Sequence, residues 1–96
     1  MSNGYWVCVY EEIKNVDKLK EYAVKATEAI KKYSGEFLVR GGRHICFEGK
    51  DFSRTVLIKF VNYEEAKKCH ESPEYKEALD ILKNHVIRNL QIVEGV

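Results

Sequence analysis

Two kinds of apolar pattern divide the chain into strands and helices. Residues 5–10 are aromatic or β-branched with only one interruption by a small residue, which predicts a strand. Between Val16 and Tyr33 apolar residues recur every three or four positions, with lysines and glutamates between them. This spacing predicts an amphipathic helix, which Asn15 can cap at its start and Gly35 at its end.

The second part of the chain repeats this alternation of strands and helices. A strand at 36–40 meets the pair Gly41-Gly42, and we expect it to resume at 43–48. A helical stretch begins at Asn62, breaks at Ser72-Pro73 and restarts there, because serine suits a helix cap and proline the first helical position. The two remaining predicted strands span 55–61 and 88–93.

The resulting order β-α-β-β-α-β predicts an α+β fold of the ferredoxin-like type, with a four-stranded antiparallel sheet in a single domain, 1–96. Two helices cover only one face of such a sheet. The first strand nevertheless offers apolar side chains to both faces: Tyr5, Val7 and Val9 on one, Trp6, Cys8 and Tyr10 on the other. Leaving about five large apolar side chains in water would forfeit about 10 kcal/mol, so we expect a homodimer that packs sheet against sheet.

Composition narrows the classes of partner and the compartment. A formal charge of +1 argues against nucleic acid, although RNA-recognition modules share this topology, because those modules need a basic surface and exposed aromatics. No apolar run approaches the length of a membrane span, and the first residues lack the features of a signal peptide. Three cysteines without a close pair predict a reduced, cytoplasmic protein without disulfides.

The segment around the glycine pair is the first candidate site. Gly41 and Gly42 allow a sharp bend or a close approach to a ligand, and Arg40 and Arg43 flank them. Because a guanidinium matches a carboxylate or phosphate, these four residues are predicted to bind an organic anion. The alternative is that the arginines pair with Glu36, Glu48 or acids of a partner subunit.

Histidines and tyrosines are the other candidates. His44, His70 and His85 are the only side chains that ordinarily titrate near neutral pH, so they are the candidate general acids or bases; the alternative is a structural role for each. Tyr22 and Tyr75 place hydroxyls on apolar stripes and are candidate ligand contacts. No HxxxH or HxH spacing occurs, and no haem-ligand motif is visible, so we expect neither a metal nor another cofactor.

Several short motifs resemble one family along almost the whole chain. They are Gly4-Tyr5-Trp6, Lys32-Tyr33-Ser34-Gly35, Phe37-Leu38-Val39-Arg40-Gly41-Gly42, Glu48-Gly49, Ser72-Pro73-Glu74-Tyr75 and Ile92-Val93-Glu94-Gly95. In this order they resemble domain-of-unknown-function family 1330. The resemblance implies a dimeric α+β barrel, in which two ferredoxin-like protomers join their sheets. Members of that superfamily include cofactor-free monooxygenases, muconolactone isomerases and haem-handling enzymes, but the family itself lends no catalytic residue.

These observations give one expected function and two alternatives. We expect a homodimer that binds a small aromatic or carboxylated molecule in a cavity between helices and sheet. The first alternative is a cofactor-independent monooxygenase or isomerase of the dimeric barrel type. The second is a structural or interaction dimer without catalysis. Fold alone cannot decide among them, because one fold hosts many functions.

Overall fold

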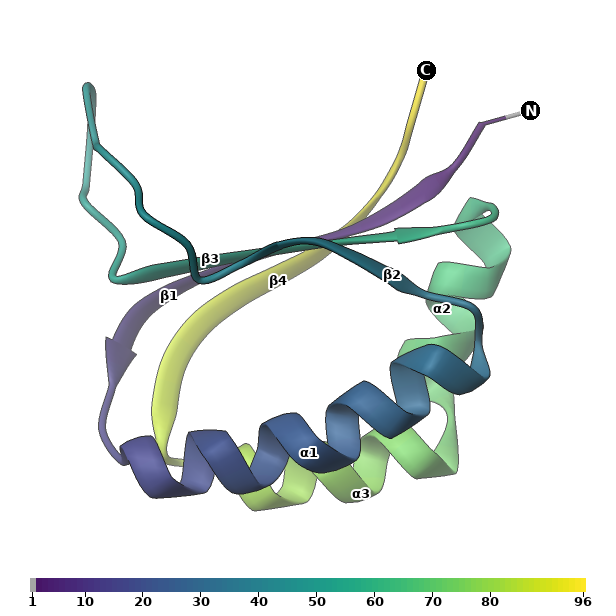
Figure 1. Ribbon diagram of the computed structural model, residues 1–96, viewed down its shortest axis with the longest axis horizontal. Coiled ribbons are helices and arrows are strands. Elements are labelled where there is room, and N and C mark those ends of the chain that lie inside the picture. Colours follow the sequence, from purple (N-terminus) through teal and green to yellow (C-terminus); the bar gives the residue numbers. More distant parts are fainter. Residues whose placement is uncertain (1) are drawn as a thin grey trace.

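A four-stranded antiparallel sheet carries three helices on one face (Figure 1). The computed structural model describes residues 2–96. The elements are β1 (Gly4–Ile13), α1 (Val16–Lys32), β2 (Glu36–Arg40), β3 (Arg54–Phe60), α2 (Tyr63–Glu71), α3 (Pro73–Leu82) and β4 (Val86–Glu94). The predicted fold class is therefore confirmed, with the second helical stretch divided into α2 and α3. Within residues 2–96 no helix has both the length and the apolar character needed to cross a membrane.

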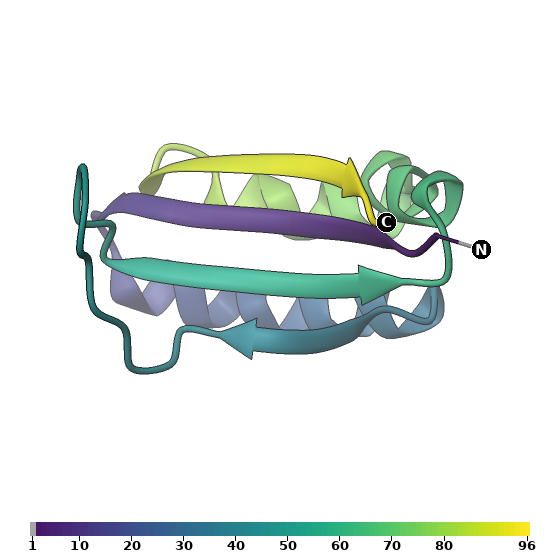
Figure 2. The same ribbon diagram turned by 90° about the horizontal axis from the view of Figure 1, so that it is seen from above.

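The strand β1 lies at the centre of the sheet, whose order is β2-β3-β1-β4. It pairs with β3 on one side and β4 on the other, so that Cys8 lies opposite both Val56 and Leu90. Trp6, Cys8 and Tyr10 point towards the helices and are buried. The alternate side chains of β1 are only half-buried and belong to the opposite face, which no helix covers (Figure 2).

Side-chain caps define the helix starts as the sequence predicts. The end of α1 differs from the prediction, because the left-handed residue there is Ser34, with φ of 61°, and not Gly35. The Asn15 side chain accepts a hydrogen bond from the Lys18 amide at the start of α1, and the Asn62 side chain does the same for Glu65 at the start of α2. Ser72 caps α3 by accepting from the Tyr75 amide, with Pro73 in the first turn. These caps satisfy amides that have no partner within the helix.

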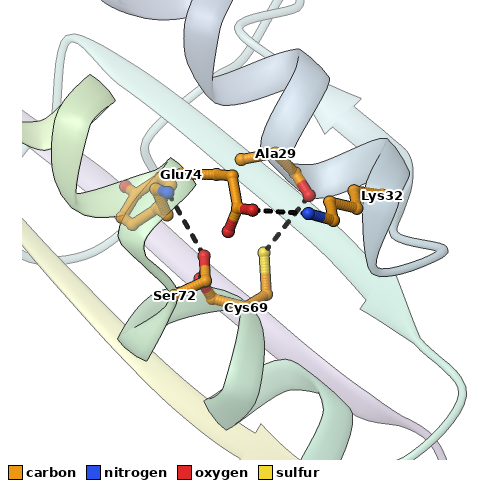
Figure 3. Close-up of polar contacts among 6 residues, drawn as sticks. Ala29, Lys32, Cys69, Ser72 and Glu74 are labelled. Atoms are coloured by element: carbon orange, nitrogen blue, oxygen red, sulfur yellow. Dashed lines mark hydrogen bonds and ion pairs between the residues drawn. The ribbon is translucent and has the colours of Figure 1, made fainter.

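Contacts with α1 hold the joint between α2 and α3 in place (Figure 3). Lys32 at the end of α1 forms an ion pair with Glu74 in the first turn of α3. Cys69 is buried beneath it, with its Sγ 3.9 Å from the carbonyl oxygen of Ala29. Burial raises the pKa of the Cys69 thiol to about 12, and the Glu74 charge acts in the same direction. The thiol is therefore protonated at neutral pH and packs as a small apolar group.

The strand predicted at 43–48 does not form, and that prediction was wrong. The chain leaves β2 at Gly41, whose φ of 67° turns it away from the sheet. Residues 43–48 are all exposed and make no ladder, and Ile45 and Phe47 are 73% and 86% exposed. An extended segment joins a sheet only when a neighbouring strand satisfies its backbone N–H and C=O groups. Residues 43–48 have no such neighbour in residues 2–96, where β2 is the edge of the sheet. The 41–53 loop instead rises on the side of the sheet opposite the helices (Figure 1).

Candidate functional site

A small cavity lies between α1 and the inner face of the sheet. We call it the α1–sheet cavity; its volume is about 40 Å³. Aromatic and aliphatic side chains make up most of its wall. The charged residues that line it are three arginines, one from each of β2, β3 and β4: Arg40, Arg54 and Arg88.

Arg88 forms the centre of a polar cluster within this apolar wall. Its Nη1 donates hydrogen bonds to the hydroxyl of Tyr10 at 2.9 Å and to that of Tyr22 at 3.3 Å. Its Nη2 donates to the hydroxyl of Tyr75 at 2.9 Å. The hydroxyls of Tyr22 and Tyr75 are themselves 2.6 Å apart, within hydrogen-bond distance. We call these four residues the Arg88 cluster.

No carboxylate balances the charge of the Arg88 cluster. The ion pairs found in residues 2–96 all use lysine or histidine, and none uses an arginine. Burial raises the pKa of Tyr10 to about 12, and it also raises the pKa values of Tyr22 and Tyr75. The three phenols are therefore neutral near pH 7, while the guanidinium of Arg88 keeps its proton. The cluster carries a net positive charge.

The Arg88 cluster also has more hydrogen-bond donors than acceptors. A guanidinium has five N–H groups and no acceptor, and each phenol adds one O–H group. The contact between Tyr22 and Tyr75 uses only one of the three hydroxyl hydrogens. An oxygen with several lone pairs and a negative charge, such as a carboxylate or phenolate, is the chemical complement of such a cluster.

The other two arginines line the cavity from β2 and β3. Arg40 donates from Nη2 to the Thr27 hydroxyl at 2.8 Å and stacks over the Phe37 ring at 4.3 Å. Its predicted alternative partner, Glu36, lies instead beside Lys59. Arg54 has a buried Nε without a hydrogen-bond partner. Arg54 also lies against Gly41.

The predicted ligand residues divide into two groups. Arg40 and Tyr22 line the cavity, and Tyr75 reaches it through its hydrogen bond to Arg88. Gly41, Gly42 and Arg43 belong to the 41–53 loop. Gly41 contacts Arg54, whereas Gly42 and Arg43 are exposed and do not line the cavity.

The three histidines lie apart, and none of them lines the α1–sheet cavity. His44 is in the 41–53 loop, 3.0 Å from a carboxylate oxygen of Asp51. His85 lies in the turn before β4, where its carbonyl accepts two backbone hydrogen bonds. His70 packs its ring against those of Trp6 and Tyr75, at centroid distances of 5.5 and 5.0 Å. In residues 2–96 no group of three or more His, Cys, Asp or Glu side chains could hold a metal ion.

Sequence reasoning did not select Arg88, Arg54 or Tyr10 as site residues. A signal for Arg88 was nevertheless present in β4. Every second residue of this strand lies on one face, and from Val86 to Ile92 these residues are Val86, Arg88, Leu90 and Ile92. The polar residues Asn89 and Gln91 alternate with the last three of them. Arg88 therefore shares the inward face of the strand with apolar residues, and a single arginine in such a set is the informative exception.

Comparison with protein families identifies the chain. The model for Domain of unknown function (DUF1330) matches residues 3–96. The chain belongs to the DUF1330 family. No curated protein matches it.

Solved structures place this DUF1330 protein among ferredoxin-like proteins. A protein of unknown function from Rhodopseudomonas palustris is similar with a TM-score of 0.81 at 9% identity, over 99% of this chain and 83% of that chain. A dimeric ferredoxin-like protein of unknown function from Jannaschia sp. CCS1 has a TM-score of 0.73 at 15% identity, over 98% of each chain. A candidate antibiotic biosynthesis monooxygenase from Caulobacter crescentus CB15 has a TM-score of 0.64 at 11% identity, over 99% of this chain and 90% of that chain. At these identities the likeness shows the fold.

Proposed function

We propose that this DUF1330 protein binds a small organic anion, aromatic or carboxylated, in the α1–sheet cavity. The observation that carries the proposal is the Arg88 cluster, in which a guanidinium meets three neutral phenols and no carboxylate. Withdrawing a cation from water costs several kcal/mol unless an opposite charge offsets it. A bound anion would supply that charge and accept the spare hydrogen bonds, while the aliphatic wall would cover the rest of the ligand.

The proposed assembly is a homodimer that joins the uncovered faces of two sheets. In register across that face lie Val7 of β1, Leu57 of β3 and Val39 of β2, which form an apolar row. Val39 is 41% exposed in the single chain. Two related folds are described as dimeric ferredoxin-like proteins, which supports the same arrangement here. Ligand binding would then take place on the helix side of each sheet.

A thermal-shift screen with matched pairs tests the ligand proposal. Butyrate against butyramide, and benzoate against benzamide, compare an anion with a neutral molecule of nearly the same shape. At about tenfold excess over Kd, the acids should raise the melting temperature by about 6–11 °C, and the amides should leave it unchanged. Arg88→Gln should abolish the response because it removes the guanidinium.

Arg43→Gln is the control variant for this screen. It also removes one arginine, but from the exposed loop and not from the cavity wall. It should respond to the acids as the wild type does. Equal responses to acids and amides would contradict the proposal, as would loss of the response in Arg43→Gln with retention in Arg88→Gln.

A second candidate function is cofactor-independent oxidation or isomerisation in the same cavity. Two structurally similar proteins are described as candidate antibiotic biosynthesis monooxygenases, and donors such as those of the Arg88 cluster can stabilise an oxyanion. Such a reaction needs a base, and the described lining residues include no carboxylate or imidazole. Burial also raises the pKa of the Cys8 thiol, so this thiol does not supply one. Mass spectrometry of the ligands after incubation in air would reveal an oxidised or isomerised product. If no ligand binds and no product forms, the remaining alternative is a structural dimer without catalysis.

A further inference from the structure

We propose that the ligand carries two carboxylates, one bound by Arg88 and the other by Arg54, and that Gly41 positions Arg54 for this role. The inference rests on the proposed function, because it names the class of ligand that the same cavity takes. Arg54 is the second anchor for three reasons, which concern its unused donor, its place in the sheet and its contact with Gly41.

The first reason is the hydrogen bonding of Arg54. Its Nε is buried and has no partner, although a buried N–H group in a folded protein nearly always has one. No ion pair in the described chain involves this guanidinium. Since Arg54 lines the same cavity as Arg88, an acceptor bound there could reach it.

The second reason is the register of the sheet. Tyr10 of β1 lies directly opposite Arg54 of β3 and directly opposite Arg88 of β4. The three residues therefore form one row across β3, β1 and β4, which are neighbouring strands of the sheet (Figure 2). The guanidinium carbons of Arg54 and Arg88 lie 5.9 and 5.5 Å from the centre of the Tyr10 ring. Neighbouring strands are about 4.8 Å apart, so two strand spacings separate the backbones of the two arginines. The arginine side chains supply part of this reach, so a four-carbon dicarboxylate held by one guanidinium at each end can bridge the two residues.

The third reason is the fit between Arg54 and Gly41. A β-carbon built at Gly41 would lie 2.1 Å from Nη1 of Arg54, so any side chain there would displace the guanidinium. Gly41 has φ of 67° and donates its amide hydrogen to the carbonyl of Thr55 at 2.8 Å, which fixes it beside the start of β3. The glycine thus leaves room for the tip of Arg54. It is a positioning residue and does not itself contact the ligand.

Calorimetric titration of the full chain with butyrate and succinate tests the inference. The two ligands have four carbons each and differ in the second carboxylate. We expect succinate to bind the wild type at least tenfold more tightly than butyrate. Arg54→Gln should remove this preference by lowering the affinity for succinate far more than that for butyrate. Arg54→Lys, which keeps the charge, should retain part of the preference.

Gly41→Ala tests the positioning role separately. It should weaken succinate binding about as much as Arg54→Gln does, with a smaller loss for butyrate. Arg43→Gln, in the neighbouring exposed loop, should keep the full preference for succinate. Circular dichroism establishes that each variant is folded.

The outcomes separate this inference from the proposed function. If butyrate binds through Arg88 but succinate binds no more tightly, the second anchor is overturned and the proposed function stands. If sulfate binds as tightly as succinate and loses that affinity in Arg54→Gln, the site takes a compact dianion and the inference is overturned. If no carboxylate binds to the wild type, both fail. An equal loss of butyrate and succinate affinity in Gly41→Ala contradicts the positioning role.

Discussion

The environment of His70 links the Arg88 cluster to the helix α2. Its ring packs against that of Tyr75, whose hydroxyl accepts a hydrogen bond from Arg88. Partial burial lowers the pKa of His70, and the positive charge of Arg88 lowers it further. Two smaller effects oppose each other: the negative charge of Glu71 raises this pKa, and the positive charge of Lys76 lowers it. The folded protein therefore favours the neutral imidazole of His70 over the protonated one.

This lowered pKa predicts a stability that depends on pH. In the unfolded chain the pKa of histidine is about 6.5, so that state binds a proton more readily than the folded state as pH falls. The contribution of His70 is fully present above that pH and is lost as pH falls through it towards the lower folded pKa. Urea unfolding at about pH 7.5 and pH 5.5 should show a larger loss of the free energy of unfolding for wild type than for His70→Gln. Equal losses in wild type and His70→Gln would contradict this account.

Elements with strong local signals could be predicted from sequence. The break between α2 and α3 follows from Ser72 and Pro73, because a serine cap and a proline in the first turn favour one conformation regardless of the rest of the fold. The strand predicted at 43–48 failed because a strand depends on a partner that local sequence does not specify. Ile45 and Phe47, which fall within that predicted strand, lie exposed in the loop.

The candidate site was predictable only in part, for a related reason. Tyr22 and Tyr75 stood out as hydroxyls on apolar helix stripes, and the structure brings both to Arg88. Their meeting with an arginine from β4 depends on the register of that strand against β1. Register is a property of the whole sheet, so neither the cluster nor its net charge could be derived from a local pattern.

For the whole molecule, the uncovered face of the sheet predicts the oligomeric state. Light scattering at micromolar concentration should give twice the mass of the 11.2 kDa chain. Val7→Lys should give a monomer, because it places a charge in the centre of the proposed interface. Val24→Lys makes the same change on α1, where Val24 is 65% exposed, and should remain dimeric. A monomeric wild type would refute the dimer, and a dimeric Val7→Lys would show that it forms through another surface.

The central claim is that the Arg88 cluster holds the acidic group of a ligand, and a crystal structure with a carboxylate from the screen tests it most directly. The account predicts electron density for the ligand in the α1–sheet cavity, with a carboxylate oxygen about 3 Å from a guanidinium nitrogen of Arg88. The hydroxyl hydrogen of Tyr10 would point to the same oxygen. An empty cavity with the ligand bound in the 41–53 loop, or on the uncovered face of the sheet, would contradict the account.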